Sequence, residues 1–166
     1  MTSEMINLIA NIALTLSVIV GLVFGIAQVR AAAQDRRERL TLETLRNFQS
    51  REFAELIHHI AFREMPTSRQ ELQARPANEQ VMFIQFSQQM ESLGMLVAER
   101  LIDIDLVEKT LGSFVTTSWE KYKTAYLDIR EQTTDPYLGE YFQWLAERLD
   151  ERMRKKPRKP FYKTAR

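Results

Sequence analysis

Two adjacent histidines, His58 and His59, form with Glu55 the best candidate for metal chemistry in this sequence. Glu55 and His58 are three residues apart, a spacing that places a carboxylate and an imidazole on one face of a helix. A di-iron carboxylate bundle needs this motif twice, together with two further glutamates. Because the chain has only two histidines, the second motif is missing. We therefore expect a surface or interface histidine pair and no bound metal, and a protonation switch at either ring stays a hypothesis.

The other residue types that do chemistry form no catalytic pattern. Ser68, Ser87 and Ser118 have no histidine at a predictable distance, and the five glycines form no phosphate-binding loop. The absence of cysteine excludes thiol catalysis, disulfides and cysteine-bound metals. Asp103 and Asp105 stand at an expected helix start, where capping explains them without catalysis. The sequence therefore predicts no enzymatic activity and no cofactor.

Six aromatic residues in the second half of the chain could be interpreted as a ligand-binding box. In a domain of this size, aromatic residues at helical spacing more often belong to the packed core. One of them, Trp144, lies off the apolar stripe of its helix, so we expect it to be an exposed contact. The six residues are Trp119, Tyr122, Tyr126, Tyr141, Phe142 and Trp144.

An uncharged apolar run lies between Glu4 and Arg30. At about 1.5 Å per helical residue, this run is longer than the roughly 30 Å hydrocarbon core of a bilayer. The sequence predicts a transmembrane helix over residues 5–30. A cleaved signal peptide is the alternative, because the segment AAAQ at 31–34 resembles a cleavage site. An uncleaved anchor is favoured, since the run is too long for a signal peptide and no basic residue precedes it.

The basic residues nearest the span predict its orientation. Arg30, Arg36, Arg37 and Arg39 follow the span closely, and no Lys or Arg precedes it. The positive-inside rule then places the N-terminus outside and the C-terminal domain in the cytoplasm, as expected for a single-pass protein of a bacterial inner (plasma) membrane. The absence of cysteine agrees with a reducing compartment.

One side of the span is small and polar, and the opposite side is bulky. On a helical wheel, Ala10, Leu14 and Ser17 cluster around Gly21. Because small residues let helix backbones approach closely, this face predicts contact with another membrane protein or with a second copy of the chain. The contact face consists of Asn7, Ala10, Ser17, Gly21, Gly25 and Gln28.

The rest of the chain predicts an all-α fold, because apolar residues recur at steps of three and four and no strand pattern occurs. A basic linker at 31–39 should lead to a small antiparallel helical bundle at 40–154. We expect its helices at about 40–63, 80–101, 105–131 and 136–154, joined by short loops. The span helix either continues into the bundle or breaks at a joint near 31–35.

Local signals predict where these helices begin. Ser68 with Glu71 forms a capping box for a short helix between Pro66 and Pro76, and Asp105 with Glu108 forms a second one. Asp135 should cap the last helix, with Pro136 in its first turn. Within the 80–101 helix, Met82 and Ile84 should widen the buried stripe, and Gly94 is either a weak point or a close-packing site.

The C-terminal end is strongly basic. Eight basic residues and no acidic residue follow Glu151, whereas residues 1–151 hold 15 basic against 22 acidic residues, a net charge of −7. We expect residues 155–166 to form a disordered tail. Attraction to anionic lipid headgroups is favoured over nucleic acid, because the chain is already tethered beside the membrane, and no specific nucleic acid is expected. The predicted lipid contacts are Arg154, Lys155, Lys156, Arg158, Lys159 and Lys163.

Several segments resemble a known family of small bacterial membrane proteins, the domain of unknown function forty-seven-sixty. They are the apolar span, the Arg-bearing linker, ESLGMLVAERLIDIDLVEKTLGSF, WEKY and YFQWLAERL. The resemblance covers most of residues 1–150 and implies a membrane-anchored helical module with no assigned reaction. It therefore supplies no catalytic residues, and the basic tail is not part of the pattern.

These observations together favour a membrane-anchored helical module for protein association, an accessory or regulatory component of a larger system without catalysis. The alternative is a membrane-tethered sensor or effector whose helical domain responds to a ligand or stress. In that case His58, His59 or the basic tail would be the responsive element.

Overall fold

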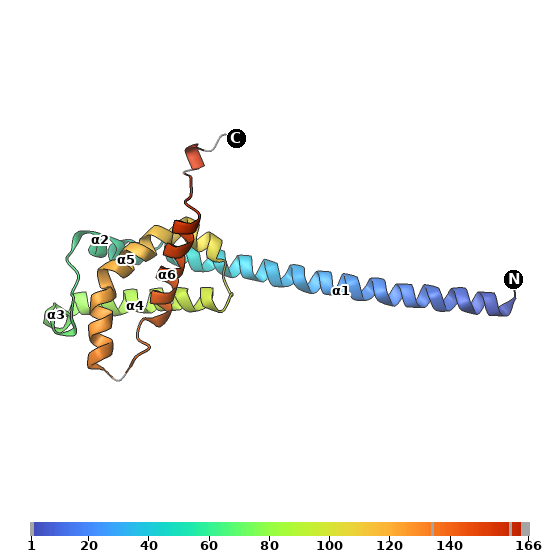
Figure 1. The fold of residues 1–166 in the computed structure, drawn as a ribbon, viewed down its shortest axis with the longest axis horizontal. Coiled ribbons are helices and arrows are strands. Elements are labelled where there is room, and N and C mark those ends of the chain that lie inside the picture. Colours follow the sequence, from blue (N-terminus) through green and yellow to red (C-terminus); the bar gives the residue numbers. More distant parts are fainter. Residues whose placement is uncertain (1, 134, 160, 164–166) are drawn as a thin grey trace. The chain divides into compact units, whose positions relative to one another are not determined.

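The computed structural model describes residues 2–133, 135–159 and 161–163. In this part of the chain there are six α-helices, one short 3-10 helix (Phe161–Lys163) and no strand, which confirms the all-α prediction (Figure 1). The chain divides into two compact units, residues 1–39 and 40–166, and each is described by itself.

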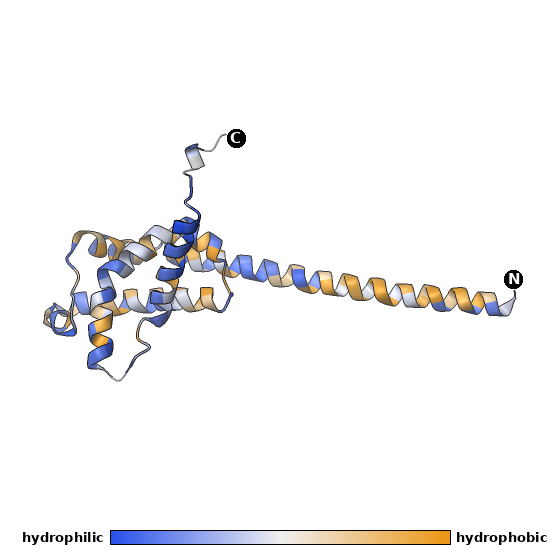
Figure 2. Ribbon diagram, viewed as in Figure 1, coloured by the Kyte–Doolittle hydropathy of each residue, from blue (hydrophilic) through white to orange (hydrophobic). Residues whose placement is uncertain are grey.

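Helix α1 (Ser3–Asn47) contains the apolar run. It is apolar toward its N-terminus and hydrophilic further along (Figure 2). By length and composition it can cross a membrane, and all of its side chains up to Arg39 are exposed. No break occurs at 31–35, so the alternative of a joint there is wrong for this structure. Neither Gly nor Pro occurs between Ile26 and Met65, so no helix-breaking residue interrupts α1 at 31–35.

The predicted helix at 40–63 is two helices. α1 ends at Asn47, and α2 (Arg51–Phe62) begins after a turn at 48–50. The Ser50 hydroxyl accepts a hydrogen bond from the Phe53 amide at 3.2 Å, so Ser50 caps the new helix. The prediction overlooked this cap.

Helix α3 (Arg69–Ala74) confirms Ser68 as its N-cap, but Glu71 bonds to Thr67 and does not complete the predicted capping box. The Ser68 hydroxyl accepts from the Glu71 amide at 3.1 Å. The Glu71 carboxylate bonds to Thr67, accepting from its amide at 2.8 Å and from its hydroxyl. The amide hydrogen bond from Thr67 is the main cause that lowers the pKa of Glu71.

Helix α4 (Ala77–Ala98) begins and ends three residues earlier than the predicted range of 80–101. The amide of Leu101 donates to the Leu96 carbonyl and that of Arg100 to Val97, while Arg100 adopts a left-handed φ of 58°. These are the hydrogen bonds of a Schellman motif, in which glycine usually takes the left-handed position. Because arginine takes this position, the sequence contains no glycine that would predict the end of the helix.

Helix α5 (Ile104–Gln132) begins at a different cap from the one predicted. Asp103 accepts a hydrogen bond from the Asp105 amide at 2.8 Å and is the N-cap. The Asp103 amide in turn donates to the hydroxyl of the buried Thr41, near the end of α1. Asp105 therefore lies in the first turn, and its carboxylate and that of Glu108 are free for another role.

Helix α6 (Glu140–Lys155) starts four residues later than predicted. Asp135 accepts from the Tyr137 amide and so stabilises a turn, while Gly139, at φ 72°, is the N-cap. Glycine has no capping side chain, and Glu91 of α4 supplies the acceptor. Its carboxylate oxygens bond to the amides of Tyr141 and Phe142 at 3.2 and 3.0 Å.

The core of residues 40–166 confirms most of the predicted apolar stripes. Four of the six aromatic residues, Trp119, Tyr122, Tyr126 and Phe142, are buried, which supports core packing. Trp144 is 40% exposed, as predicted, but Ile84 is 53% exposed, so the prediction that it widens the α4 stripe is wrong. The buried apolar residues include Phe53, Leu56, Ile60, Phe83, Phe86, Met90, Leu93, Val97, Val107, Val115, Leu145 and Leu149.

Candidate interaction surfaces

The histidine motif does not assemble into a site. Glu55 pairs with Arg51 at 2.9 Å. His58 is exposed, and its ring centroid lies 4.8 Å from that of Phe62. Among the described residues, no group of three His, Asp or Glu side chains lies close enough to hold a metal.

The predicted contact face of the apolar segment is open on α1. A Cβ atom built on Gly21 or Gly25 would meet nothing within 4 Å. Both glycines line a shallow apolar groove, together with Leu22, Ile26, Val29 and Arg30. The Ser17 hydroxyl donates to the Ala13 carbonyl at 2.8 Å, so it needs no external partner. The side-chain amides of Asn7 and Gln28 make no hydrogen bond within the described chain and could bond to another helix.

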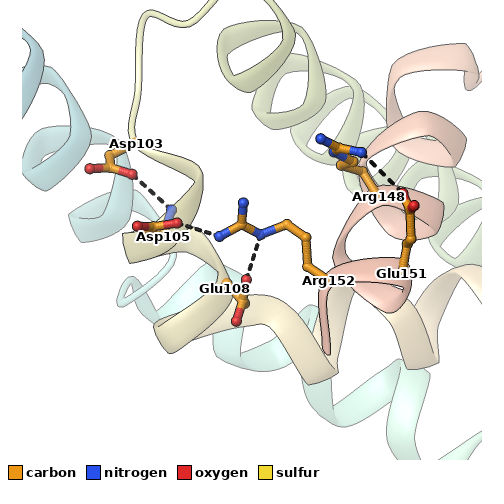
Figure 3. Close-up of polar contacts among 6 residues, drawn as sticks. All are labelled: Asp103, Asp105, Glu108, Arg148, Glu151 and Arg152. Carbon is orange, nitrogen blue, oxygen red and sulfur yellow. Dashed lines mark hydrogen bonds and ion pairs between the residues drawn. The ribbon is translucent and has the colours of Figure 1, made fainter. Parts of the chain in front are cut away.

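The last turns of α6 are fixed to the start of α5 by Arg152 (Figure 3). Its guanidinium donates to Glu108 at 2.7 Å and also to Asp105. The hydrogen bond with Glu108 is the main cause that raises the pKa of Arg152, so this group is always cationic. Glu108 is only 12% exposed, and Arg152 thus neutralises a largely buried carboxylate. Arg152 is therefore part of the packing of the bundle.

The six predicted lipid-binding residues form two groups. Arg154 pairs with Asp150, and Lys155 pairs with Glu151 at 2.5 Å, both along α6. The hydrogen bond from Lys155 is the main cause that lowers the pKa of Glu151.

The second group consists of Lys156, Arg158, Lys159 and Lys163. These side chains are exposed and make no ion pair within the described residues. Lys163 lies 5.8 Å above the ring of Tyr162. Residues 160 and 164–166, which include the basic Arg166, lie outside the described residues. The unpaired positive charge of the described tail therefore begins at Lys156, after α6 has ended.

A groove that the sequence analysis did not single out runs along α4. Its volume is about 540 Å³, and it is formed by the end of α1, the start of α2 and one side of α4. Most of its lining is uncharged and polar, and Glu52 is its one charged residue among those described. The sequence did contain a signal, since Gln85, Gln88, Gln89 and Ser92 recur at helical spacing. The lining residues are Thr44, Asn47, Phe48, Ser50, Glu52, Gln85, Gln88, Gln89, Ser92, Leu93 and Leu96.

Comparison with known proteins identifies a family without an assigned activity. No curated protein and no solved structure matches the chain. The sequence model of one family matches residues 15–149, from the apolar segment to the last turns of α6. The chain therefore belongs to the family described as domain of unknown function (DUF4760).

Proposed function

We propose that this protein is a membrane-anchored helical module for protein association, an accessory or regulatory component of a larger membrane system that performs no catalysis itself. The observation that carries the proposal is the open glycine face of α1, which lies within a segment long and apolar enough to span a bilayer. Gly21 and Gly25 form a Gly-x-x-x-Gly pattern, which lets a second helix approach the backbone closely.

The anchor is proposed to remain uncleaved in the cytoplasmic membrane, with the N-terminus outside. Four arginines between Arg30 and Arg39 support this orientation, because basic residues flank the cytoplasmic end of membrane helices. Residues 40–166 would then present their surface to cytoplasmic partners. The four unpaired basic residues of the tail would bind anionic headgroups of the same membrane leaflet.

Purification of the full chain from its native membrane in a mild detergent tests the proposal. The wild-type protein should recover a stoichiometric partner, either a second copy or another membrane protein. Replacement of both Gly21 and Gly25 by Ile should lower this recovery at least fivefold, because the branched side chains fill the groove. The matched control changes Ile19 and Val23 to Leu on the opposite side of the helix and should leave recovery unchanged.

Two results would count against this function. Equal recovery by the glycine variant and the wild type would show that the glycine face is not the contact. A wild-type chain that purifies alone and monomeric would favour the sensor or effector alternative.

A further inference from the structure

The groove along α4 combines polar side chains that have no partners with an apolar floor. Gln85, Gln88 and Gln89 line one wall, and none of their side chains makes a hydrogen bond within the described residues. Leu93 is buried and Leu96 is partly buried at the same groove. The volume of this groove lies within the usual range of ligand-binding clefts, about 300–1,000 Å³, and its lining is more polar than is usual for them.

One of these side chains carries an unsatisfied atom. The Oε1 atom of Gln89 is buried and accepts no hydrogen bond. A buried acceptor without a donor is costly, and this cost is recovered when the amide turns toward a ligand that donates an N–H. Gln89 therefore favours a ligand that carries hydrogen-bond donors.

The spacing of the carboxamides narrows the class of ligand. Gln85 and Gln89 are four residues apart, which places them about 6 Å apart along the helix axis. In an extended peptide, the backbone groups on one edge repeat every two residues, about 6.7 Å. A carboxamide both donates and accepts, as a peptide group does, so Gln85 and Gln89 match two neighbouring peptide groups on one edge of an extended chain.

The remaining lining residues indicate which side chains of such a peptide would fit the groove. Phe48, Leu93 and Leu96 offer apolar contacts, and the one carboxylate among the described lining residues is that of Glu52. From Gln85 to Leu96, the wall is about 16 Å long, enough for roughly five extended residues. The matching segment is thus short and mainly uncharged, with one basic residue.

We infer that the α4 groove binds a short extended peptide segment of a partner protein, with Gln85 and Gln89 bonded to its backbone. Glu52 binds a Lys or Arg of the segment. This inference rests on the proposed association function and names its partner site on the helical domain. It is independent of the glycine face of α1.

Fluorescence anisotropy with a defined peptide pool tests the inference. The protein is the full chain in nanodiscs of phosphatidylcholine, a neutral lipid. The probe is a labelled pool of hexapeptides, each with one Lys at any position and otherwise Ala, Val, Leu, Ser or Thr. Binding should be saturable, and methylation of the backbone nitrogens should weaken it at least tenfold, because it removes the N–H donors. Replacing the Lys of the pool by Glu should also weaken binding.

Substitutions of the groove glutamines test whether the peptide binds in the α4 groove. Gln85→Ala and Gln89→Leu should each weaken peptide binding about tenfold, while Gln73→Ala, an exposed glutamine on α3 outside the groove, should leave binding unchanged. Thermal unfolding followed by circular dichroism checks the fold. Gln89→Leu should melt at or above the wild-type temperature, since it removes a buried unpaired oxygen.

The inference is overturned if the pool does not bind, if methylated and unmethylated pools bind equally, or if the glutamine variants bind like the wild type. These failures can be told apart from failure of the proposed function. If partners still co-purify through the glycine face while the peptide pool does not bind, association stands and the groove assignment is wrong.

Discussion

At the scale of single residues, two glycines within helices differ in how closely their neighbours pack against them. A Cβ atom on Gly94 of α4 would overlap the Tyr141 carbonyl at the start of α6. On Gly112 of α5, a Cβ atom would meet the side chains of Glu108 and Met153 at 3.6 Å, an ordinary contact. The close-packing explanation for Gly94 is therefore the correct one, and Gly112 has no such constraint.

Gly94→Ala should destabilise the full chain by about 1–3 kcal/mol, because the backbone carbonyl of Tyr141 must move to admit the methyl group. The matched control is Gly112→Ala, which should raise stability by about 0.5–1 kcal/mol, since alanine favours the helix. Thermal unfolding in detergent, followed by circular dichroism, measures both. Similar shifts for the two variants would refute the close-packing role.

At the scale of elements, side chains from other helices satisfy several helix ends. Asp128 of α5 accepts from the Arg69 amide at the start of α3 at 2.7 Å. Lys121 of α5 donates to the Ile60 carbonyl near the end of α2 at 2.7 Å. With Glu91 at the start of α6, these contacts join the short helices to the rest of the domain. Such a cap stabilises a helix only when its neighbour is in place, so these ends depend on one another.

Helix α3 also has a local cap that depends on pH. Hydrogen bonds from Thr67 lower the pKa of Glu71 below its ordinary value of 4.5. Since the unfolded chain binds this proton more readily, the ionised cap contributes stability above pH 4.5, and this contribution disappears as the pH falls through the lowered pKa.

Glu71→Gln should therefore lower the melting temperature at pH 7, and the difference from the wild type should shrink as the pH falls below 4.5. The control is Glu131→Gln, an exposed glutamate that makes no side-chain hydrogen bond among the described residues. It should show no comparable change with pH. A Glu71→Gln difference that stays constant down to pH 3 would exclude the charged cap.

At the scale of the whole molecule, charge is divided along the chain. Residues 1–151 carry 15 basic and 22 acidic residues, and the eight basic residues that follow are not balanced by any acid. The structure refines this division, because Arg152, Arg154 and Lys155 pair with carboxylates on α5 or α6. Among the described residues that follow Glu151, the cations without an ion pair are therefore Lys156, Arg158, Lys159 and Lys163.

Energy transfer from a dye on the tail to a labelled lipid tests the predicted lipid contact. A dye can be attached at Ala165→Cys, since the chain has no other cysteine. For the full chain in nanodiscs, transfer should be higher with anionic phosphatidylglycerol than with phosphatidylcholine alone. It should fall as salt rises from 0.1 to 1 M, where the screening length drops from about 10 to 3 Å.

Replacing Lys156, Arg158, Lys159 and Lys163 by Glu should abolish the effect of anionic lipid, since each basic residue contributes about 1 kcal/mol near the membrane surface. The control replaces the paired Arg154 and Lys155 by Gln. This variant should keep most of the increase in energy transfer that anionic lipid causes. Transfer that does not depend on lipid charge would rule out this contact.

The sequence by itself determined the features that arise from local periodicity. Each of these features can be recognised from residues that lie within a few helical turns of one another. They are the uncharged run before Arg30, the apolar stripes of α4 and α5, and the Ser68 cap. Helix geometry is regular, so spacing along the sequence predicts which residues share a face. The all-α fold, the buried aromatic residues and the exposed Trp144 followed from this regularity.

Only the tertiary structure decided the features that join distant segments. Glu91 and the start of α6 are 50 residues apart, and Arg152 and Glu108 are 44 residues apart, so no local pattern predicts either pairing. The same holds for the α4 groove, where Asn47 and Gln85 face one cavity from different helices. The end of α4 was also not predictable from the sequence, because Arg100 takes a left-handed backbone conformation that its residue type does not favour. Spacing fixes the face of a helix, but only packing decides what that face meets.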